Sequence, residues 1–171
     1  PEAHALAYRD QGFLAEGLLN YLALLGWAIA ADRDVFTLAE MVDAFDIRDV
    51  NPNPARFDLK KAEAINADHM RMLSIEDLTH RVIPFLKAEG VLTDPVNDAD
   101  AQLLELAMPL VAERMNKLTE AAPMLGFLFT DEVKRVDELD NAGRDVVRAA
   151  REALEALPTW STAAIEEALR E

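Results

Sequence analysis

The sequence contains no cysteine and only six glycines and three histidines among its 171 residues. The absence of cysteine excludes disulfides, thiolate-bound metals and cysteine nucleophiles, and it fits the cytosol. The glycines are dispersed, so there is no glycine-rich phosphate loop. His4, His69 and His80 have no second ligand at metal spacing. We therefore assign no catalytic residue, metal site or cofactor to these residues.

Long apolar runs are also lacking. The longest, from Leu18 to Ala31, is interrupted by Asn20. It is too short for a bilayer, which takes about 20 apolar residues. We find no signal-peptide pattern either, and we expect a cytoplasmic protein without a membrane partner.

Positive charge is scarce, because 17 basic residues stand against 32 acidic ones and give a net charge of -15. Residues 1–73 hold 7 basic and 12 acidic side chains, and residues 74–171 hold 10 and 20. Such a balance disfavours a nucleic-acid partner unless positive charge is concentrated locally. Composition alone favours an acidic helical protein-interaction module.

Helical periodicity is what the sequence has in abundance. Between Gly12 and Trp27, leucines recur at helical spacing and other apolar residues fill the opposite side, which predicts a helix that is buried almost all round. Gly12 should form the turn before this helix, and Gly26 should end it in a left-handed conformation. No segment alternates as a strand does, so the predicted fold is all-α.

Capping residues divide the rest of the chain. Thr37 and Glu40 have the spacing of a capping box, Ser74 is a helix cap and Gly90 a helix stop. We place a boundary near Leu73, which gives two consecutive helical subdomains, residues 1–73 and 74–171. The predicted helices run over residues 2–10, 12–27, 38–45, 57–70 and 75–89, then through a long helix that includes Leu104 and Leu118, and finally over residues 137–157 and 162–171.

The second half also has regular apolar faces. One face predicts a single long helix and comprises Leu104, Met108, Val111, Met115 and Leu118. The helix over 137–157 should bury Val146, Val147, Ala150, Leu154 and Leu157. For the run Phe127-Leu128-Phe129, we favour burial over the alternative of stacking on RNA bases.

Two local clusters of basic residues interrupt the acidic background. Arg48, Arg56, Lys60 and Lys61 outnumber the neighbouring acids, and Arg144, Arg148 and Arg151 form a stripe in which Asp140 and Glu152 are possible ion-pair partners. Lysine and arginine neutralise phosphates without reading sequence, so both clusters are candidates for RNA-backbone contact. A solvated helix face is the alternative for each.

Two blocks of residues carry a family resemblance. The first reads Y-R at 8–9, G-F-L at 12–14, E at 16, L-L-N-Y-L at 18–22 and L-G-W at 25–27; the second has Phe57, Asp58, Lys61 and Asn66 in register. They resemble stretches of bacterial glutamyl-tRNA synthetases, which are class I glutamate–tRNA ligases. In that family the first block follows the KMSKS-type loop. Ala15 and Gly17 replace the proline and alanine that the family usually has there.

The resemblance implies a piece of a longer protein, cut at both ends, whose parent attaches glutamate to its cognate tRNA with ATP. Residues 1–73 would be a stem-contact region containing Arg48, Arg56, Lys60 and Lys61. Residues 74–171 would begin the anticodon-binding region, with Arg114, Lys117, Arg144, Arg148 and Arg151 on the anticodon side. Neither the HIGH-type nor the KMSKS-type motif is present. The resemblance therefore places glutamate, ATP and Mg²⁺ in a missing catalytic part, and this piece alone should be inactive.

Overall fold

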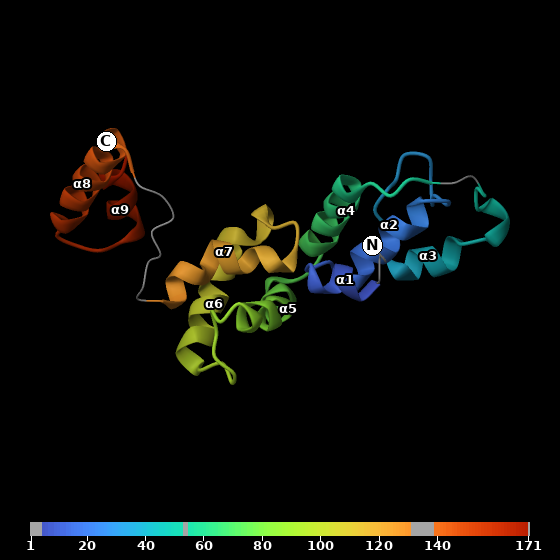
Figure 1. Ribbon diagram of the computed structural model, residues 1–171, viewed down its shortest axis with the longest axis horizontal. Helices are drawn as coiled ribbons and strands as arrows, with labels where there is room; N and C mark the ends of the chain where they lie inside the picture. The colour runs from blue at the N-terminus through green and yellow to red at the C-terminus, as the bar shows by residue number, and fades with distance from the viewer. Residues whose placement is uncertain (1–4, 53–54, 131–138, 171) are drawn as a thin grey trace. The chain divides into compact units, whose positions relative to one another are not determined.

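The computed structural model describes residues 5–52, 55–130 and 139–170, and it divides the chain into two compact units, residues 1–132 and 133–171. Within the described residues there are helices and no strand, which confirms the all-α prediction (Figure 1). Predictions that involve residues 2–4, Asn53, Pro54, Asp137 or Glu171 lie outside the described residues. The α-helices are α1 (Ala5–Asp10), α2 (Ala15–Leu24), α3 (Leu38–Ala44), α4 (Leu59–Arg71), α5 (Ile75–Ala88), α6 (Asp98–Val111), α7 (Ala121–Leu125), α8 (Asn141–Glu155) and α9 (Thr162–Ala168).

Short 3-10 helices link several of these elements. They are η1 (Ile47–Asp49), η2 (Ala112–Arg114), η3 (Leu118–Glu120) and η4 (Gly126–Phe129). The first unit contains everything from α1 to η4, so it extends across the boundary that we predicted near Leu73. That boundary falls in the turn between α4 and α5, and the division of function between the two regions stays a prediction.

The predicted caps are confirmed. Thr37 and Glu40 form the capping box of α3, in which each side chain bonds the backbone N–H of the other residue. The Ser74 hydroxyl accepts the Asp77 N–H at the start of α5. Gly90 follows α5 with φ +71°, as its role as a helix stop requires.

The prediction that α2 is buried all round is wrong, because Leu19 and Leu22 are exposed. The inward side of α2 instead holds Gly17, Asn20 and Tyr21, since α4 lies directly against it. A Cβ on Gly17 would stand 2.9 Å from the Asn66 Cα, so only glycine permits this approach. The two helices are packed closely enough to exclude larger side chains.

The backbone conformation of Gly26 also differs from the predicted left-handed one. The only described glycines with positive φ are Gly12 and Gly90. The chain leaves α2 through right-handed helical backbone at Leu25, and the Gly26 carbonyl then accepts the Asn51 N–H at 2.7 Å. A long-range hydrogen bond thus anchors the end of α2 where we expected a glycine cap.

The main core lies among α5, α6 and α7 and includes the predicted face of Leu104, Met108, Val111, Met115 and Leu118, all of which are buried. The prediction of a single long helix is wrong, however, because α6 ends at Val111 and Met115 has extended backbone. The Asn66 amide binds the Asn116 carbonyl at 2.6 Å, and the Glu120 carboxylate accepts the Asn116 N–H at 2.7 Å. These bonds stabilise a bend that still directs the same side chains inward.

A smaller core of Phe13, Tyr21, Ala62 and Ile65 joins α2 to α4. The Tyr21 ring packs edge-on against Phe57 at 4.9 Å, and its hydroxyl accepts the Asp58 N–H at 2.5 Å. Asp58 is in turn the N-cap of α4 and accepts the Lys61 N–H. The start of α4 is therefore fixed from both sides.

Exposed apolar side chains contradict two predictions. Phe127 and Leu128, both expected to be buried, are 64% and 36% exposed, whereas Phe129 packs against the main core. In the second unit, Val146 and Val147 are exposed although we expected them to face inward. There α8 packs with α9 alone among the described elements of that unit, and a single partner helix covers only part of an apolar face.

Candidate nucleic-acid interface

Asn66 on α4 connects the two cores of the first unit. Its side chain is fully buried, its oxygen accepts the Leu14 N–H at 2.8 Å, and its amide donates to the Asn116 carbonyl. Beside it the Leu118 N–H donates to the Gly12 carbonyl at 2.9 Å. We call the residues 11–14, Asn66 and 116–119 the seam. The seam holds α2, α4 and the bend after α6 together.

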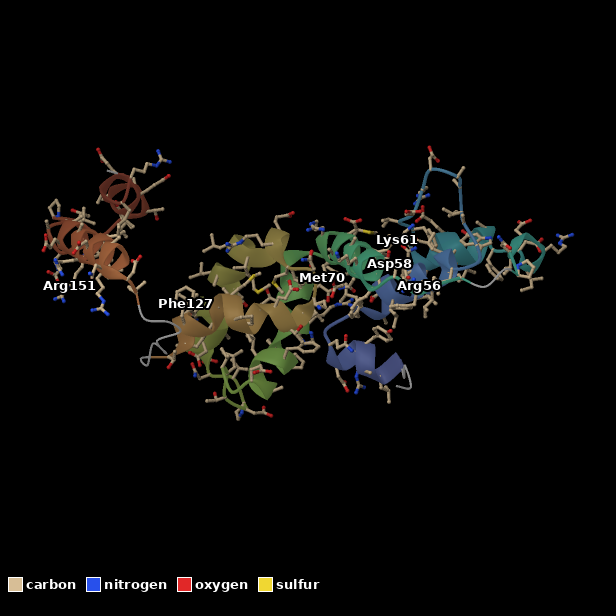
Figure 2. All side chains as sticks on the ribbon, turned by 45° about the horizontal axis from the view of Figure 1, so that its top comes forward. Arg56, Asp58, Lys61, Met70, Phe127 and Arg151 are labelled. Atoms are coloured by element: carbon tan, nitrogen blue, oxygen red, sulfur yellow. The ribbon has the colours of Figure 1, made fainter. Side chains whose placement is uncertain are left out.

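The cluster predicted around the start of α4 separates into paired and unpaired cations. Lys61 Nζ lies 2.9 Å from an Asp34 carboxylate oxygen, and Arg48 is paired with Asp46. Arg56 and Lys60 are exposed and form no ion pair with any other described residue. Figure 2 shows Arg56 and Lys61 close together beside Asp58 at the start of α4. Among the described residues, the cations of this cluster without an ion pair are therefore Arg56 and Lys60.

Arg48 forms a strong ion pair with Asp46. The side-chain hydrogen bonds between the two residues raise the pKa of Arg48 above its usual value and lower the pKa of Asp46. An RNA phosphate would have to displace the Asp46 carboxylate before it could bind the guanidinium. Arg48 thus fits phosphate contact less well than Arg56 or Lys60.

The two predicted anticodon-side residues of the first unit, Arg114 and Lys117, also differ in whether a carboxylate pairs with them. Lys117 Nζ lies 2.6 Å from a Glu63 carboxylate oxygen and is half-buried. Arg114 is exposed, donates to the Leu110 carbonyl at 3.3 Å and has no carboxylate partner in the part of the chain that is described. Arg114 is therefore the more accessible cation, and Lys117 links α4 to the segment before η3.

The three arginines of α8 lie in the second unit and are all exposed. Arg144 donates to the Leu139 carbonyl at 2.9 Å, and the ion pairs are Arg148–Asp145 at 3.2 Å and Arg151–Glu155 at 2.7 Å. Asp140 caps α8 by accepting the Gly143 N–H. The partners that we expected, Asp140 and Glu152, are not the ones used. Exposed pairs of this kind contribute little stability, about 0–1 kcal/mol.

A buried polar network that sequence analysis missed lies between α2 and α4. His69 Nε2 is 2.8 Å from the Asn20 Oδ1, which also accepts the Phe36 N–H at 3.0 Å. The Asn20 amide donates to the Asp34 carbonyl at 2.9 Å. Since the Asn20 oxygen is an acceptor, His69 carries its hydrogen on Nε2. The signal available in the sequence was asparagine within apolar runs, at Asn20 and again at Asn66.

Burial lowers the pKa of His69 below its ordinary 6.5, against the opposing charges of Glu16 and Asp68. His69 therefore binds a proton more readily in the unfolded chain than in the folded one. The stability that neutral His69 contributes to the fold is fully present above pH 6.5, and it is lost as the pH falls through the lowered pKa of the folded state. We expect the free energy of unfolding to decrease between about pH 7 and about pH 5, and to decrease less in His69→Gln. Denaturant unfolding at several pH values measures this.

The exposed His80 provides the matched control, because His80→Gln removes a histidine that lies outside the hydrogen-bond network of Asn20 and His69. Glu40 has its pKa lowered from 4.5 to about 2 by the Thr37 N–H and by Arg33, so it titrates below this window. Equal slopes for wild type and His69→Gln would contradict the assignment.

In the described ranges no three histidine, aspartate or glutamate side chains are placed to hold a metal ion. None of the helices found there is long and apolar enough to cross a bilayer.

Comparison with known proteins shows which family the chain resembles. Residues 77–171 match the family model of the anticodon binding domain. The chain is similar to the glutamate–tRNA ligase of Nocardioides sp., with 71% identity over 99% of this chain and 36% of the relative, and to that of Kineococcus radiotolerans, with 52% identity over 99% and 35%. It thus spans about a third of the length of these relatives.

Solved structures give the same result. A glutamate–tRNA ligase from Elizabethkingia meningosepticum, solved with its amino acid, matches with a TM-score of 0.71 and 25% identity over 95% of this chain and 32% of that chain. The enzyme from Elizabethkingia anophelis matches with a TM-score of 0.70 and 26% identity over the same shares. These findings confirm the family resemblance over the interaction-module alternative, and the chain belongs to the anticodon-binding domain family.

Proposed function

We propose that this chain is the tRNA-positioning part of a glutamate–tRNA ligase, whose parent attaches glutamate to its cognate tRNA with ATP in the cytoplasm. The observation that carries the proposal is the 71% identity to such a ligase over 99% of the chain. In this proposal, residues 1–73 contact the tRNA stem and residues 74–171 approach the anticodon.

The catalytic steps are assigned to the rest of the parent. The residues present do not fit ATP and Mg²⁺, because the described part holds no metal-ligand cluster and the sequence has no glycine-rich phosphate loop. We therefore place glutamate, ATP and Mg²⁺ outside these 171 residues. The role left to this chain is to bind and orient RNA.

Phosphate contact is assigned first to Arg56 and Lys60, because binding there breaks no ion pair with another described residue. Salt-dependent affinity is the expected signature, since each neutralised phosphate releases condensed counterions. Arg114 is the corresponding accessible cation on the anticodon side. Contact through the paired cations Arg48, Lys61, Lys117, Arg148 and Arg151 would require their carboxylate partners to be exchanged for phosphate.

Charge reversal at Lys60 tests this proposal. In Lys60→Glu, binding of a transcript of tRNA for glutamate should weaken, and the slope of log affinity against log salt should fall by about 1, because one fewer phosphate is neutralised. Fluorescence anisotropy titrations at several salt concentrations provide both values.

Arg9→Glu is the matched control. Arg9 is exposed on α1 and paired with Asp10, and its reversal changes the net charge by the same amount. If the two variants change the salt slope equally, Lys60 acts only through the overall charge and the assigned contact fails. Both variants are compared in the full-length parent; if the unmutated parent does not bind the transcript at all, the proposed function itself fails.

A further inference from the structure

Helix α3 presents apolar side chains to solvent. Leu38 is 53% exposed, Val42 is 69% exposed and Phe45, directly after the helix, is 42% exposed. At spacings of four and three residues these side chains share one side of α3. Ile47, which is 73% exposed, follows on η1. We call Leu38, Val42, Phe45 and Ile47 the α3 ridge. So many large apolar side chains on one short segment are typical of an interaction surface.

Packing beneath the α3 ridge holds it in place. The Phe45 ring lies 5.6 Å from the ring of the buried Trp27, which in turn packs edge-on against Phe36 at 5.5 Å. The capping box of Thr37 and Glu40 fixes the start of the helix. Figure 1 shows α3 beside α2, the helix against which it packs. A surface that is already ordered loses little conformational freedom when a partner binds.

The free charges around the α3 ridge are negative. Both neighbouring arginines, Arg33 and Arg48, are already paired with carboxylates. Asp43 on α3 and Asp49 on η1 are exposed and form no ion pair with another described residue. The whole chain has a net charge of -15. The surface therefore attracts a basic partner and repels the phosphates of RNA.

We infer that the α3 ridge is a docking surface for a basic amphipathic helix of another protein. The apolar side of that helix lies on the ridge, and its lysines or arginines face Asp43 and Asp49. A ridge with this spacing is matched by apolar residues at the same spacing on a partner helix. A second copy of this acidic chain is disfavoured by its charge. The inference does not rest on the proposed function, because the ridge includes none of the cations assigned to RNA.

The test uses the full-length parent and two synthetic helical peptides of about 18 residues. The basic probe has leucines on one side and lysines on the other, and the acidic probe has glutamate in place of every lysine. Wild type should bind the basic probe at least about tenfold more tightly than the acidic one. In Leu38→Ser/Val42→Ser, affinity for the basic probe should fall about tenfold, because two apolar contacts are lost. Fluorescence anisotropy of labelled probes measures both.

A second variant changes the charges and keeps the α3 ridge. In Asp43→Asn/Asp49→Asn, binding of the basic probe should weaken about threefold at low salt, and the difference should disappear at high salt because exposed charges are screened. The matched control is Leu106→Ser/Leu110→Ser, which removes two exposed leucines from α6. It should leave the affinity for the basic probe unchanged.

Four results would overturn the inference. They are a wild type that does not bind the basic probe, an equal loss of affinity in the α3 and α6 leucine variants, displacement of the probe by a tRNA transcript, and self-association of wild type that Leu38→Ser/Val42→Ser abolishes. The first and second exclude a docking surface, the third makes the surface an RNA contact, and the fourth makes it an interface between copies. Binding of the transcript is measured separately, and its absence would overturn the proposed function while the inference stands.

Discussion

Replacing Asn66 with leucine is expected to lower the free energy of unfolding by about 2–5 kcal/mol. Leucine has a similar shape, so the main loss is chemical. The Leu14 N–H and the Asn116 carbonyl, bonded to Asn66 at 2.8 and 2.6 Å, would remain inside the seam without partners. An unsatisfied buried polar group costs about 1–3 kcal/mol, and two are created. Urea unfolding followed by circular dichroism measures the change.

Asn116→Ala is the control that shows whether the loss of stability comes from the hydrogen bonds of the seam or from the removal of any amide side chain. The Asn116 residue is exposed, and its bonds to Asn66 and Glu120 use only backbone atoms. Its replacement should change stability by less than about 0.5 kcal/mol. If Asn66→Leu is as mild as Asn116→Ala, the seam does not stabilise the first unit.

Gly12→Ala should also be severe, with a loss of about 3 kcal/mol or more. Gly12 has φ +87°, a region that disfavours alanine. An added Cβ would lie 2.6 Å from the Thr119 backbone nitrogen and 2.9 Å from that of Leu118. Backbone atoms cannot rotate away as a side-chain tip can, so the Leu118–Gly12 hydrogen bond must break. Thermal and urea unfolding both report the loss.

Gly90 provides the comparison for conformation alone. It has φ +71° with nothing within 4 Å of the position of a Cβ. Gly90→Ala should therefore lose only the conformational part, about 1–2 kcal/mol. Equal losses at the two glycines would show that contact across the seam adds nothing to the backbone strain.

Sequence alone predicted the features that are set by neighbours in the chain. The Thr37–Glu40 box and the Ser74 cap depend on residues three positions apart, and both were placed correctly. The apolar face that begins at Leu104 was also correct, because periodicity reports burial directly. Local order and local periodicity were therefore sufficient for the all-α fold.

Features set by distant residues were predicted less well. The bend after Val111 preserves the inward direction of Met115, so periodicity could not reveal that the helix ends. The exposure of Leu19 depends on which side α4 covers, and that of Phe127 on where the main core ends. These outcomes follow from packing between segments, which spacing along one helix does not encode.

The candidate site was predicted in part for the same reason. The sequence pointed to clusters of basic residues, but not to which of them are already paired. Lys61 reaches Asp34 and Lys117 reaches Glu63 only after the chain folds, whereas Lys60 stays unpaired in the part of the chain that is described. Accessible charge is thus a property of the tertiary structure.

The seam also determines when the first unit can finish folding during synthesis. The Thr119 hydroxyl bonds the Gln11 carbonyl across 108 positions, beside the Leu118–Gly12 bond. Closing so long a loop has a large entropic cost and makes such contacts slow to form. On the ribosome, helices α2 to α5 are synthesised before Leu118 and Thr119, so the Gly12 carbonyl has no Leu118 N–H to accept until later. The N-terminal helices of this chain complete their packing only after the bend beyond α6 has left the ribosome.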